Sequence, residues 1–309
     1  MMSKIATREA YGKALSDIVL KNDNIIVLDA DLSKSTKTCD AKNASPKSFY
    51  NMGIAESNMI GVAAGLASCG KTVFASSFAM FLAGRAFEQI RNSIAYPNLN
   101  VKLCATHSGI TVGEDGASHQ AIEDIALMRS IPNMTVISPC DAVETAEAIK
   151  FISTFNGPCY VRLGRLAVDT VNDNSNYTFE LGKGVTLKEG NYCTIIATGS
   201  MVQPSLEAAK ILEAENIHVR VVNIHTIKPL DEDLIIKCAK ETGKIITVEE
   251  HNVIGGLGSA VSEVICEKHP TLVKKIGIND VFGQSGTPNI LLEHYGLTAK
   301  DIVKAVKSL

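Results

Sequence analysis

The sequence predicts an α/β protein made of two three-layer αβα domains. Apolar runs of strand length alternate with segments of helix length, a pattern typical of parallel sheets covered by helices on both faces. The length of 309 residues is enough for two domains, each with its own core. A polar, asparagine-rich stretch without periodicity, residues 169–177, predicts the boundary. We therefore expect a first domain at 1–170, a linker at 171–185 and a second domain at 186–309.

Each domain has its own series of expected elements. In the first, a helical segment with apolar residues at 10, 14, 18 and 19 precedes strands expected at 25–28, 72–75, 101–105, 134–137 and 159–163. In the second, strands are expected at 194–197, 219–224, 244–248 and 275–278. Helices expected at 205–214, 258–268 and 298–307 fill the gaps between them.

Composition and charge exclude several classes of function. The formal net charge is −3 and no block of like charges occurs, so nothing indicates binding to nucleic acid. The eight cysteines form no Cys-x-x-Cys pair, which fits reduced, mostly buried thiols. The N-terminal residues contain no apolar signal segment, and the apolar run at 59–67 is too short to span a bilayer. We expect a cytoplasmic protein that binds neither nucleic acid nor membrane.

The polar loop at 107–120 holds the densest set of reactive side chains. It follows the strand expected at 101–105 and contains His107, His119, Glu114, Asp115 and three glycines. Ligands of open parallel sheets bind just beyond the carboxyl ends of the strands. Imidazole accepts or donates a proton near neutral pH, and glycine lets a loop fold closely around a ligand. The loop is therefore interpreted as part of a catalytic site rather than as a solvated turn.

Two further segments of the first domain are candidates when taken together with this loop. Glu56 begins a long helix of small residues, where a carboxylate also interacts favourably with the helix dipole without any other function. Phe78 and Phe81 follow the strand expected at 72–75, and three-residue spacing places two aromatics on one helical face. Such a pair packs in a core more often than it binds a ring, so each segment alone leaves both interpretations open.

Four motifs in this order resemble the C-terminal half of a transketolase. They are residues 53–56 (Gly-Ile-Ala-Glu), the phenylalanine-rich segment 77–90, residues 113–120 (Gly-Glu-Asp-Gly-Ala-Ser-His-Gln) and residues 129–134 (Arg-Ser-Ile-Pro-Asn-Met). The resemblance covers essentially the whole chain. It implies the pyrimidine-binding fold of thiamine diphosphate enzymes, followed by a transketolase C-terminal domain.

The resemblance implies a role for each matching residue. Glu56 matches the glutamate that hydrogen-bonds N1′ of the aminopyrimidine ring of thiamine diphosphate, and Phe78 and Phe81 match the apolar pocket around that ring. The cofactor then supplies the nucleophile for breaking a carbon–carbon bond. His107 and His119 match residues of the substrate channel and, with Glu56, are expected to be catalytic. Of the two histidines, His119 is expected to exchange the proton of the sugar hydroxyl.

Other matches concern the sugar phosphate. Asp115 is expected to accept hydrogen bonds from substrate hydroxyls, and His107 to lie near the substrate phosphate. The matches to the phosphate-binding positions of the family are Arg8, Ser35 and Arg165, with Arg162 as a rival to Arg165.

The sequence departs from the family pattern in two places. Ser108 and Gly109 stand where full-length transketolases usually have Asp-Ser, and Gly84 stands where many carry a ring-lining aromatic. These departures concern the shape of the substrate channel and hence sugar preference.

The chain lacks the motif that binds the other end of the cofactor. In the family a separate domain with Gly-Asp-Gly and a later Asn holds the diphosphate and its Mg²⁺, and no Gly-Asp-Gly occurs here. We therefore expect no metal ligands in this chain and a partner, an N-terminal transketolase subunit, that supplies them. An α2β2 assembly, with self-association of this chain, is expected.

The second domain offers fewer candidates. Residues 255–258 precede a helix but lack a full Gly-x-Gly-x-x-Gly, because Val261 holds the last position, and tight helix packing is favoured there. Glu249, Glu250 and His251 stand at the end of a strand and are not expected to be catalytic.

Three functions follow from these expectations. The first is a split transketolase subunit that moves a two-carbon ketol unit from a ketose phosphate to an aldose phosphate, as in the pentose phosphate pathway. The second is a related thiamine enzyme, either a 2-oxo acid dehydrogenase β subunit or a protein similar to deoxyxylulose-phosphate synthase. The third is a non-catalytic scaffold, which would need none of Glu56, His107, Asp115 and His119.

Overall fold

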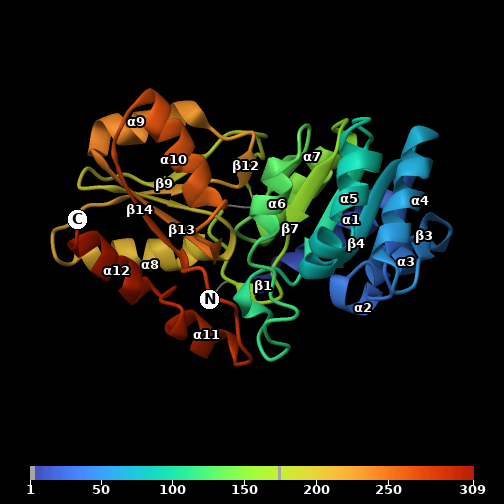
Figure 1. Ribbon diagram of the computed structural model, residues 1–309, viewed down its shortest axis with the longest axis horizontal. Helices are drawn as coiled ribbons and strands as arrows, with labels where there is room; N and C mark the ends of the chain where they lie inside the picture. The colour runs from blue at the N-terminus through green and yellow to red at the C-terminus, as the bar shows by residue number, and fades with distance from the viewer. Residues whose placement is uncertain (1–3, 173–174) are drawn as a thin grey trace.

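The computed structural model describes residues 4–172 and 175–309 and contains two α/β halves placed side by side (Figure 1). The first half is built on a seven-stranded sheet with the strand order β12-β6-β7-β5-β4-β2-β3. Its strands are β2 (Ile25–Asp29), β3 (Phe49–Asn51), β4 (Thr72–Phe78), β5 (Val101–Thr106), β6 (Thr135–Ile137), β7 (Cys159–Arg162) and β12 (Thr226–Lys228). Neighbouring strands are parallel except β12, which is antiparallel to β6.

Helices cover both faces of this sheet, and the longer ones bury one apolar side. Helix α4, for example, buries Met59, Ile60 and Ala63 while Gly61 and Gly65 stay exposed. The helices of this half are α1 (Thr7–Val19), α2 (Ser33–Thr36), α3 (Cys39–Ala44), α4 (Glu56–Ser68), α5 (Phe87–Gln89), α6 (Asp124–Ser130) and α7 (Ala142–Thr154). The 3₁₀ turns η1 (Pro46–Ser48) and η4 (Ile110–Val112) and the π-helices η2 (Met80–Arg85) and η3 (Ile90–Ala95) complete it.

The second half is built on a five-stranded sheet with the order β14-β13-β10-β11-β9. Its strands are β9 (Val185–Lys188), β10 (Thr194–Ala197), β11 (Arg220–Asn223), β13 (Lys244–Asn252) and β14 (Leu272–Ile278), of which β9 is antiparallel to β11. Its helices are α8 (Val202–Glu213), α9 (Glu232–Thr242), α10 (Leu257–Lys268), α11 (Pro288–His294) and α12 (Ala299–Lys307), with the 3₁₀ turn η5 (Gly199–Met201) before α8. A short antiparallel pair, β1 (Ile5–Ala6) and β8 (Ala167–Val168), joins the two ends of the first half.

The predicted α/β class is confirmed, but the sheets are mixed rather than wholly parallel. The predicted parallel strands form the centre of each sheet, and an antiparallel strand, β12 or β9, is added at one edge. Strand β12 belongs to the second half of the chain yet pairs with β6 of the first sheet, between the two halves in Figure 1. The ranges 1–170, 171–185 and 186–309 for domains and linker stay a prediction. Within the described residues, no helix has the length and apolarity needed to cross a membrane.

Candidate active site

Glu56 is a buried carboxylate at the start of α4. Only 3% of the residue is exposed. Its position at the helix N-terminus stabilises the negative charge of the carboxylate. Ser77 in β4 donates a hydrogen bond from Oγ to Glu56 Oε1 over 3.2 Å. Arg85, half-exposed at the end of η2, donates from one guanidinium nitrogen to both carboxylate oxygens, each over 3.2 Å. The carboxylate is therefore held by one hydroxyl from the sheet and one cation from the rim.

Four rings gather at the carboxyl ends of two neighbouring strands. Strands β4 and β5 are parallel, with Phe78 opposite Thr106, so Phe78 and His107 leave the sheet side by side. Their ring centroids are 3.8 Å apart and stacked, and Phe81 stacks on Phe78 at 5.7 Å. His119 meets both phenylalanines edge-on, at 6.3 Å from Phe78 and 5.1 Å from Phe81. Phe78 is the last residue of β4, not a helical residue as its spacing from Phe81 suggested, because the strand continues past residue 75.

His107 is buried among contacts that favour its neutral form. Its backbone has φ +57°, and its ring donates from Nδ1 to Thr106 Oγ1 over 2.9 Å, because Nε2 faces a donor of Arg8 at 3.1 Å. Burial, followed by the charges of Arg8 and Arg165, lowers the pKa of His107 from 6.5 to about 3. A neutral imidazole with both nitrogens engaged is suited to orient a ligand rather than to carry a proton.

This lowered pKa predicts a specific dependence of stability on pH. Above pH 6.5 His107 is neutral in both the folded and the unfolded chain, and below it only the unfolded chain takes up the proton. Relative to a His107→Asn variant, the wild-type chain should lose about 1.4 kcal/mol of unfolding free energy per pH unit below about pH 6. Asn is the control residue because it tolerates positive φ. Denaturant titrations at pH 7, 6 and 5 measure this difference, and parallel curves for the two proteins would contradict it.

Arg8 and Arg165 bring two cations toward His107. Arg8, in the first turn of α1, also donates to the backbone oxygen of Ser35 over 2.9 Å, which places α2 beside this cluster. The Nε of Arg8 is buried without a hydrogen-bond partner among the described residues. Arg165 is 39% exposed and hydrogen-bonds the backbone oxygen of Val112, inside the loop that leads to His119. Burial and then the nearby charge of Arg165 lower the pKa of Arg8, although Glu9 opposes them. The two cations favour an anion here, although the carboxylate of Glu114 already lies 3.5 Å from Arg165.

Asp115 and His119 lie on the exposed part of the same loop. Asp115 is exposed and His119 is half-buried. The loop turns sharply here, since Gly113 and Gly116 have φ of +90° and +75°. His119 Nδ1 lies 3.0 Å from the hydroxyl of Ser118, so its Nε2 is the nitrogen turned to other groups. The rim of the site thus carries one carboxylate and one imidazole.

Arg162, the rival to Arg165, is enclosed between the two halves. It is 5% exposed, and its Nε donates to both oxygens of Asp124 over 3.1 and 2.9 Å. A second nitrogen donates to the backbone oxygens of Ala121 and Glu250, over 3.2 and 2.9 Å. This arrangement favours Arg165 as the phosphate candidate.

Comparison with known protein families identifies the family of the chain. The model of the transketolase pyrimidine-binding domain matches residues 3–170, and that of the transketolase C-terminal domain matches residues 182–302. The chain belongs to the transketolase family. The predicted resemblance to the C-terminal half of a transketolase is thereby confirmed, together with its pyrimidine-binding and C-terminal domains.

Individual transketolase relatives match over nearly the whole chain. A putative transketolase C-terminal section of Methanocaldococcus jannaschii is 52% identical over 97% of this chain and 94% of its own length. A 6-deoxy-6-sulfo-D-fructose transketolase subunit of a Clostridium species is 42% identical over 96% of this chain and 92% of its own. One subunit of the apulose-4-phosphate transketolase of Phocaeicola vulgatus is 38% identical over 97% and 96%. The sugars named for the last two relatives differ from each other.

A solved structure of a transketolase is also similar. It is described as a split gene transketolase in an inactive β4 tetramer, and it superposes with a TM-score of 0.91 at 56% identity. The superposition covers 99% of this chain and 98% of the other.

Sequence reasoning missed two residues in and beside this candidate site. Arg85 was not considered, and no pattern in its neighbourhood connects it to Glu56, 29 residues away. Glu250 was noted only as part of a strand end, yet its side chain contacts Thr111 in the loop of the first half. Within residues 4–172 and 175–309, no group of three or more His, Cys, Asp or Glu side chains is placed to hold a metal ion.

Proposed function

We propose that this chain is the subunit of a thiamine diphosphate-dependent transketolase that binds the pyrimidine end of the cofactor and the sugar phosphate. With a partner chain it transfers a two-carbon ketol unit from a ketose phosphate to an aldose phosphate. The observation that carries the proposal is the meeting of Glu56, two phenylalanines and two histidines at the carboxyl ends of β4 and β5. A cytoplasmic location and a role in the pentose phosphate pathway remain predictions.

The side chain of Arg85 supports the fit of a pyrimidine ring. Its planar guanidinium lies 4.1 Å from the ring centroid of Phe81 and donates to both oxygens of Glu56. The guanidinium is a flat nitrogen-bearing group that stacks on an aromatic ring and hydrogen-bonds to a carboxylate. An aminopyrimidine needs the same two interactions. Glu56 and Phe81 would therefore hold the pyrimidine, with Phe78 behind Phe81. When bound, thiamine diphosphate supplies the carbon nucleophile that attacks the ketose carbonyl.

The remaining residues act on the substrate. Arg8 and Arg165 would bind the phosphate, which neutralises their mutual repulsion, and neutral His107 would orient it through the Arg8 contact. The backbone at Ser35 fixes Arg8, and the exposed carboxylate of Asp115 would accept hydrogen bonds from sugar hydroxyls. His119 would take the proton that the sugar hydroxyl loses as the carbon–carbon bond breaks, at the nitrogen not turned to Ser118.

A partner chain is part of the proposal. Relatives of nearly the same length are named as subunits, and the similar β4 tetramer is described as inactive. The described residues of this chain offer no cluster of carboxylates and imidazoles for Mg²⁺, which would stabilise the diphosphate. We therefore assign the diphosphate and Mg²⁺ end to an N-terminal transketolase subunit in an α2β2 assembly, while this chain alone self-associates.

Reconstitution tests the proposed function. The chain should be purified alone and together with an N-terminal transketolase subunit from the same source, then supplied with thiamine diphosphate, Mg²⁺ and xylulose 5-phosphate plus ribose 5-phosphate. We expect ketol transfer only by the pair, because each chain is proposed to bind one end of the cofactor. Sedimentation velocity of the active pair measures the stoichiometry.

The same experiment separates the alternatives. Turnover of pyruvate without ketol transfer would indicate a 2-oxo acid dehydrogenase β-type or deoxyxylulose-phosphate synthase-like subunit. Tight binding of thiamine diphosphate and full turnover by the isolated chain would refute the need for a partner. An assembled pair with neither activity would favour a scaffold. Sulfosugar and apulose phosphate donors belong in the same assay, because relatives are named for those sugars.

A further inference from the structure

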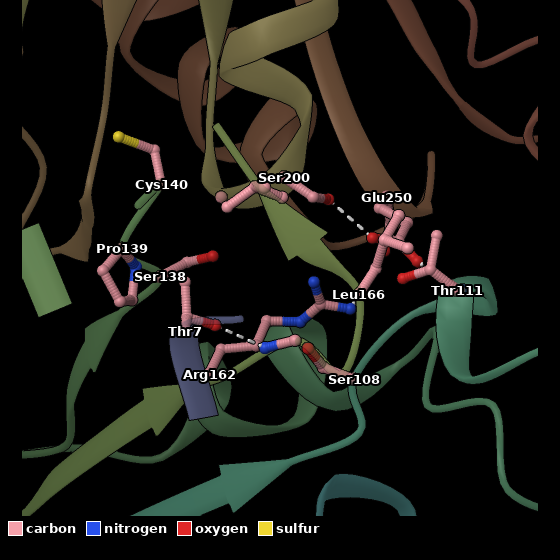
Figure 2. Close-up of a pocket in the computed structure, with 13 residues that line it drawn as sticks. Thr7, Ser108, Thr111, Ser138, Pro139, Cys140, Arg162, Leu166, Ser200 and Glu250 are labelled. Carbon is pink, nitrogen blue, oxygen red and sulfur yellow. Dashed lines mark hydrogen bonds between the residues drawn. The ribbon is translucent and has the colours of Figure 1, made fainter. Parts of the chain in front are cut away.

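The second half of the chain reaches into the loop that carries His107, Asp115 and His119. Glu250, near the end of β13, is 3% exposed and points across the boundary between the two halves (Figure 2). Its Oε1 accepts a hydrogen bond from the backbone N–H of Thr111 over 2.7 Å, across 139 residues of sequence. Its Oε2 accepts a hydrogen bond from Ser200 Oγ over 2.6 Å. Both oxygens of this carboxylate are thus committed, one to each half.

The contact with Thr111 is at the start of a helical turn. Thr111 belongs to η4, so the carboxylate caps an N–H group that has no partner inside the turn. Gly109 directly precedes this turn with φ +75°, and a Cβ there would lie 2.1 Å from Glu250 Oε1. The loop and the carboxylate are therefore fitted to each other at van der Waals distance, and Gly109 is required by that approach.

Further contacts tie the same loop to the second half. Asn252 donates its backbone N–H to the oxygen of Ile122 over 2.9 Å, and Gln120 donates from its side chain to the oxygen of Gln284 over 3.0 Å. The two ends of the loop are joined by the hydrogen bond from Gly109 to Ala121, 2.8 Å long. Among these contacts, that of Glu250 uses a carboxylate as the acceptor. Hydrogen bonds to charged acceptors are stronger than those to neutral ones.

The space around Glu250 excludes a ligand role. The cavity that it lines with Thr7, Ser108, Arg162 and Ser200 encloses about 20 Å³, which accommodates a water molecule and no sugar phosphate (Figure 2). Glu250 therefore acts on the loop and does not touch the reacting molecules.

We propose that Glu250 is a positioning residue of the active site: from the C-terminal domain it fixes the loop that presents His107, Asp115 and His119 to the substrate. The inference rests on the proposed function for its effect on catalysis, but the loop contact stands without it. The loop presents the side chains for sugar binding and proton transfer, and it touches the pyrimidine pocket only through the packing of His107 and His119 on Phe78 and Phe81. Loosening the loop should therefore weaken substrate binding and turnover more than cofactor affinity.

Three variants of the full chain test this role. Glu250→Ala removes both hydrogen bonds, whereas Glu250→Gln keeps an acceptor for Thr111 and offers a donor to Ser200 Oγ. Glu249→Gln is the matched control, since Glu249 is an equally buried neighbour whose carboxylate accepts from Leu257 and Gly258 within the second half. Hydrogen exchange of the peptide spanning 109–121 is measured in each chain, and KM, kcat and thiamine diphosphate affinity in each reconstituted pair.

For Glu250→Ala we expect exchange in this peptide to accelerate about 10- to 100-fold, because a hydrogen bond to a buried charged acceptor is lost. KM for the sugar phosphate should rise and kcat fall, each by about tenfold, with a smaller change in thiamine diphosphate affinity. Glu250→Gln should restore most of both, and Glu249→Gln should leave the peptide protected.

Unchanged exchange in Glu250→Ala, or equal effects of Glu249→Gln, would overturn the role. Accelerated exchange in a pair that shows no ketol transfer even as wild type would support the positioning contact and reject the proposed function instead.

Discussion

A Glu56→Gln variant is expected to lower kcat of the reconstituted pair by about 10²- to 10⁴-fold, the range typical of a lost proton-exchanging group. The amide keeps the size of the side chain but cannot share a proton with a ring nitrogen. Glu56 is 3% exposed in this chain, and the amide oxygen can still accept hydrogen bonds from Ser77 and Arg85, so the fold and assembly with the partner should be kept. Steady-state kinetics with xylulose 5-phosphate measures the loss, and sedimentation confirms that the pair is intact.

The control for this prediction is Glu88→Gln. Glu88 is an exposed acidic residue in the first turn of α5, and its carboxylate accepts hydrogen bonds from Gln89 and Asn92. Ordinary turnover is expected from that variant. If the turnover of Glu56→Gln stays within about twofold of wild type, the proposed mechanism is wrong. A tenfold change in rate corresponds to about 1.4 kcal/mol in the activation free energy.

The second large effect concerns stability. Asp124→Ala should lower the free energy of unfolding by about 3–5 kcal/mol, because it removes the carboxylate that pairs with the buried guanidinium of Arg162. Asp124 also accepts a hydrogen bond from the hydroxyl of Tyr160 over 2.8 Å, which would lose its partner as well. Chemical denaturation of the isolated chain at pH 7 measures the loss.

Two further variants separate the ion pair from general packing. Tyr160→Phe removes one hydrogen bond and should cost only about 1–2 kcal/mol. Combining Asp124→Leu with Arg162→Met removes both charges and should recover a large part of the loss, since an apolar replacement of a buried pair is often neutral. A loss below about 1 kcal/mol for Asp124→Ala would show that water reaches Arg162 after all.

The sequence was informative wherever structure depends on neighbours in the chain. Strand-length apolar runs located the centres of both sheets, and the local motifs around Glu56, Phe78 and His119 identified side chains that the fold places in one cluster of contacts. Their proximity follows from parallel order, because β4 and β5 end at the same edge.

Contacts between distant segments could not be read in this way. Strand β12 is three residues long and pairs with β6 about ninety positions earlier, so its alternation carries almost no signal. The capping of Thr111 by Glu250 depends on how the halves pack, and a glutamate at a strand end looks the same with or without such a partner. Arg85 was hidden for a related reason, since η2 is a π-helix and residues in it do not follow the usual helical spacing.

The guanidinium of Arg85 has one more consequence for the proposed cofactor. It lies between Phe81 and Glu56, so a pyrimidine ring bound there as proposed would have to compete with this side chain for the site. The measured dissociation constant would then be the intrinsic one divided by the fraction of molecules in which Arg85 has moved away. A partner chain that draws this half-exposed arginine outward would tighten cofactor binding without contacting the ring, and the two binding events would be cooperative in both directions.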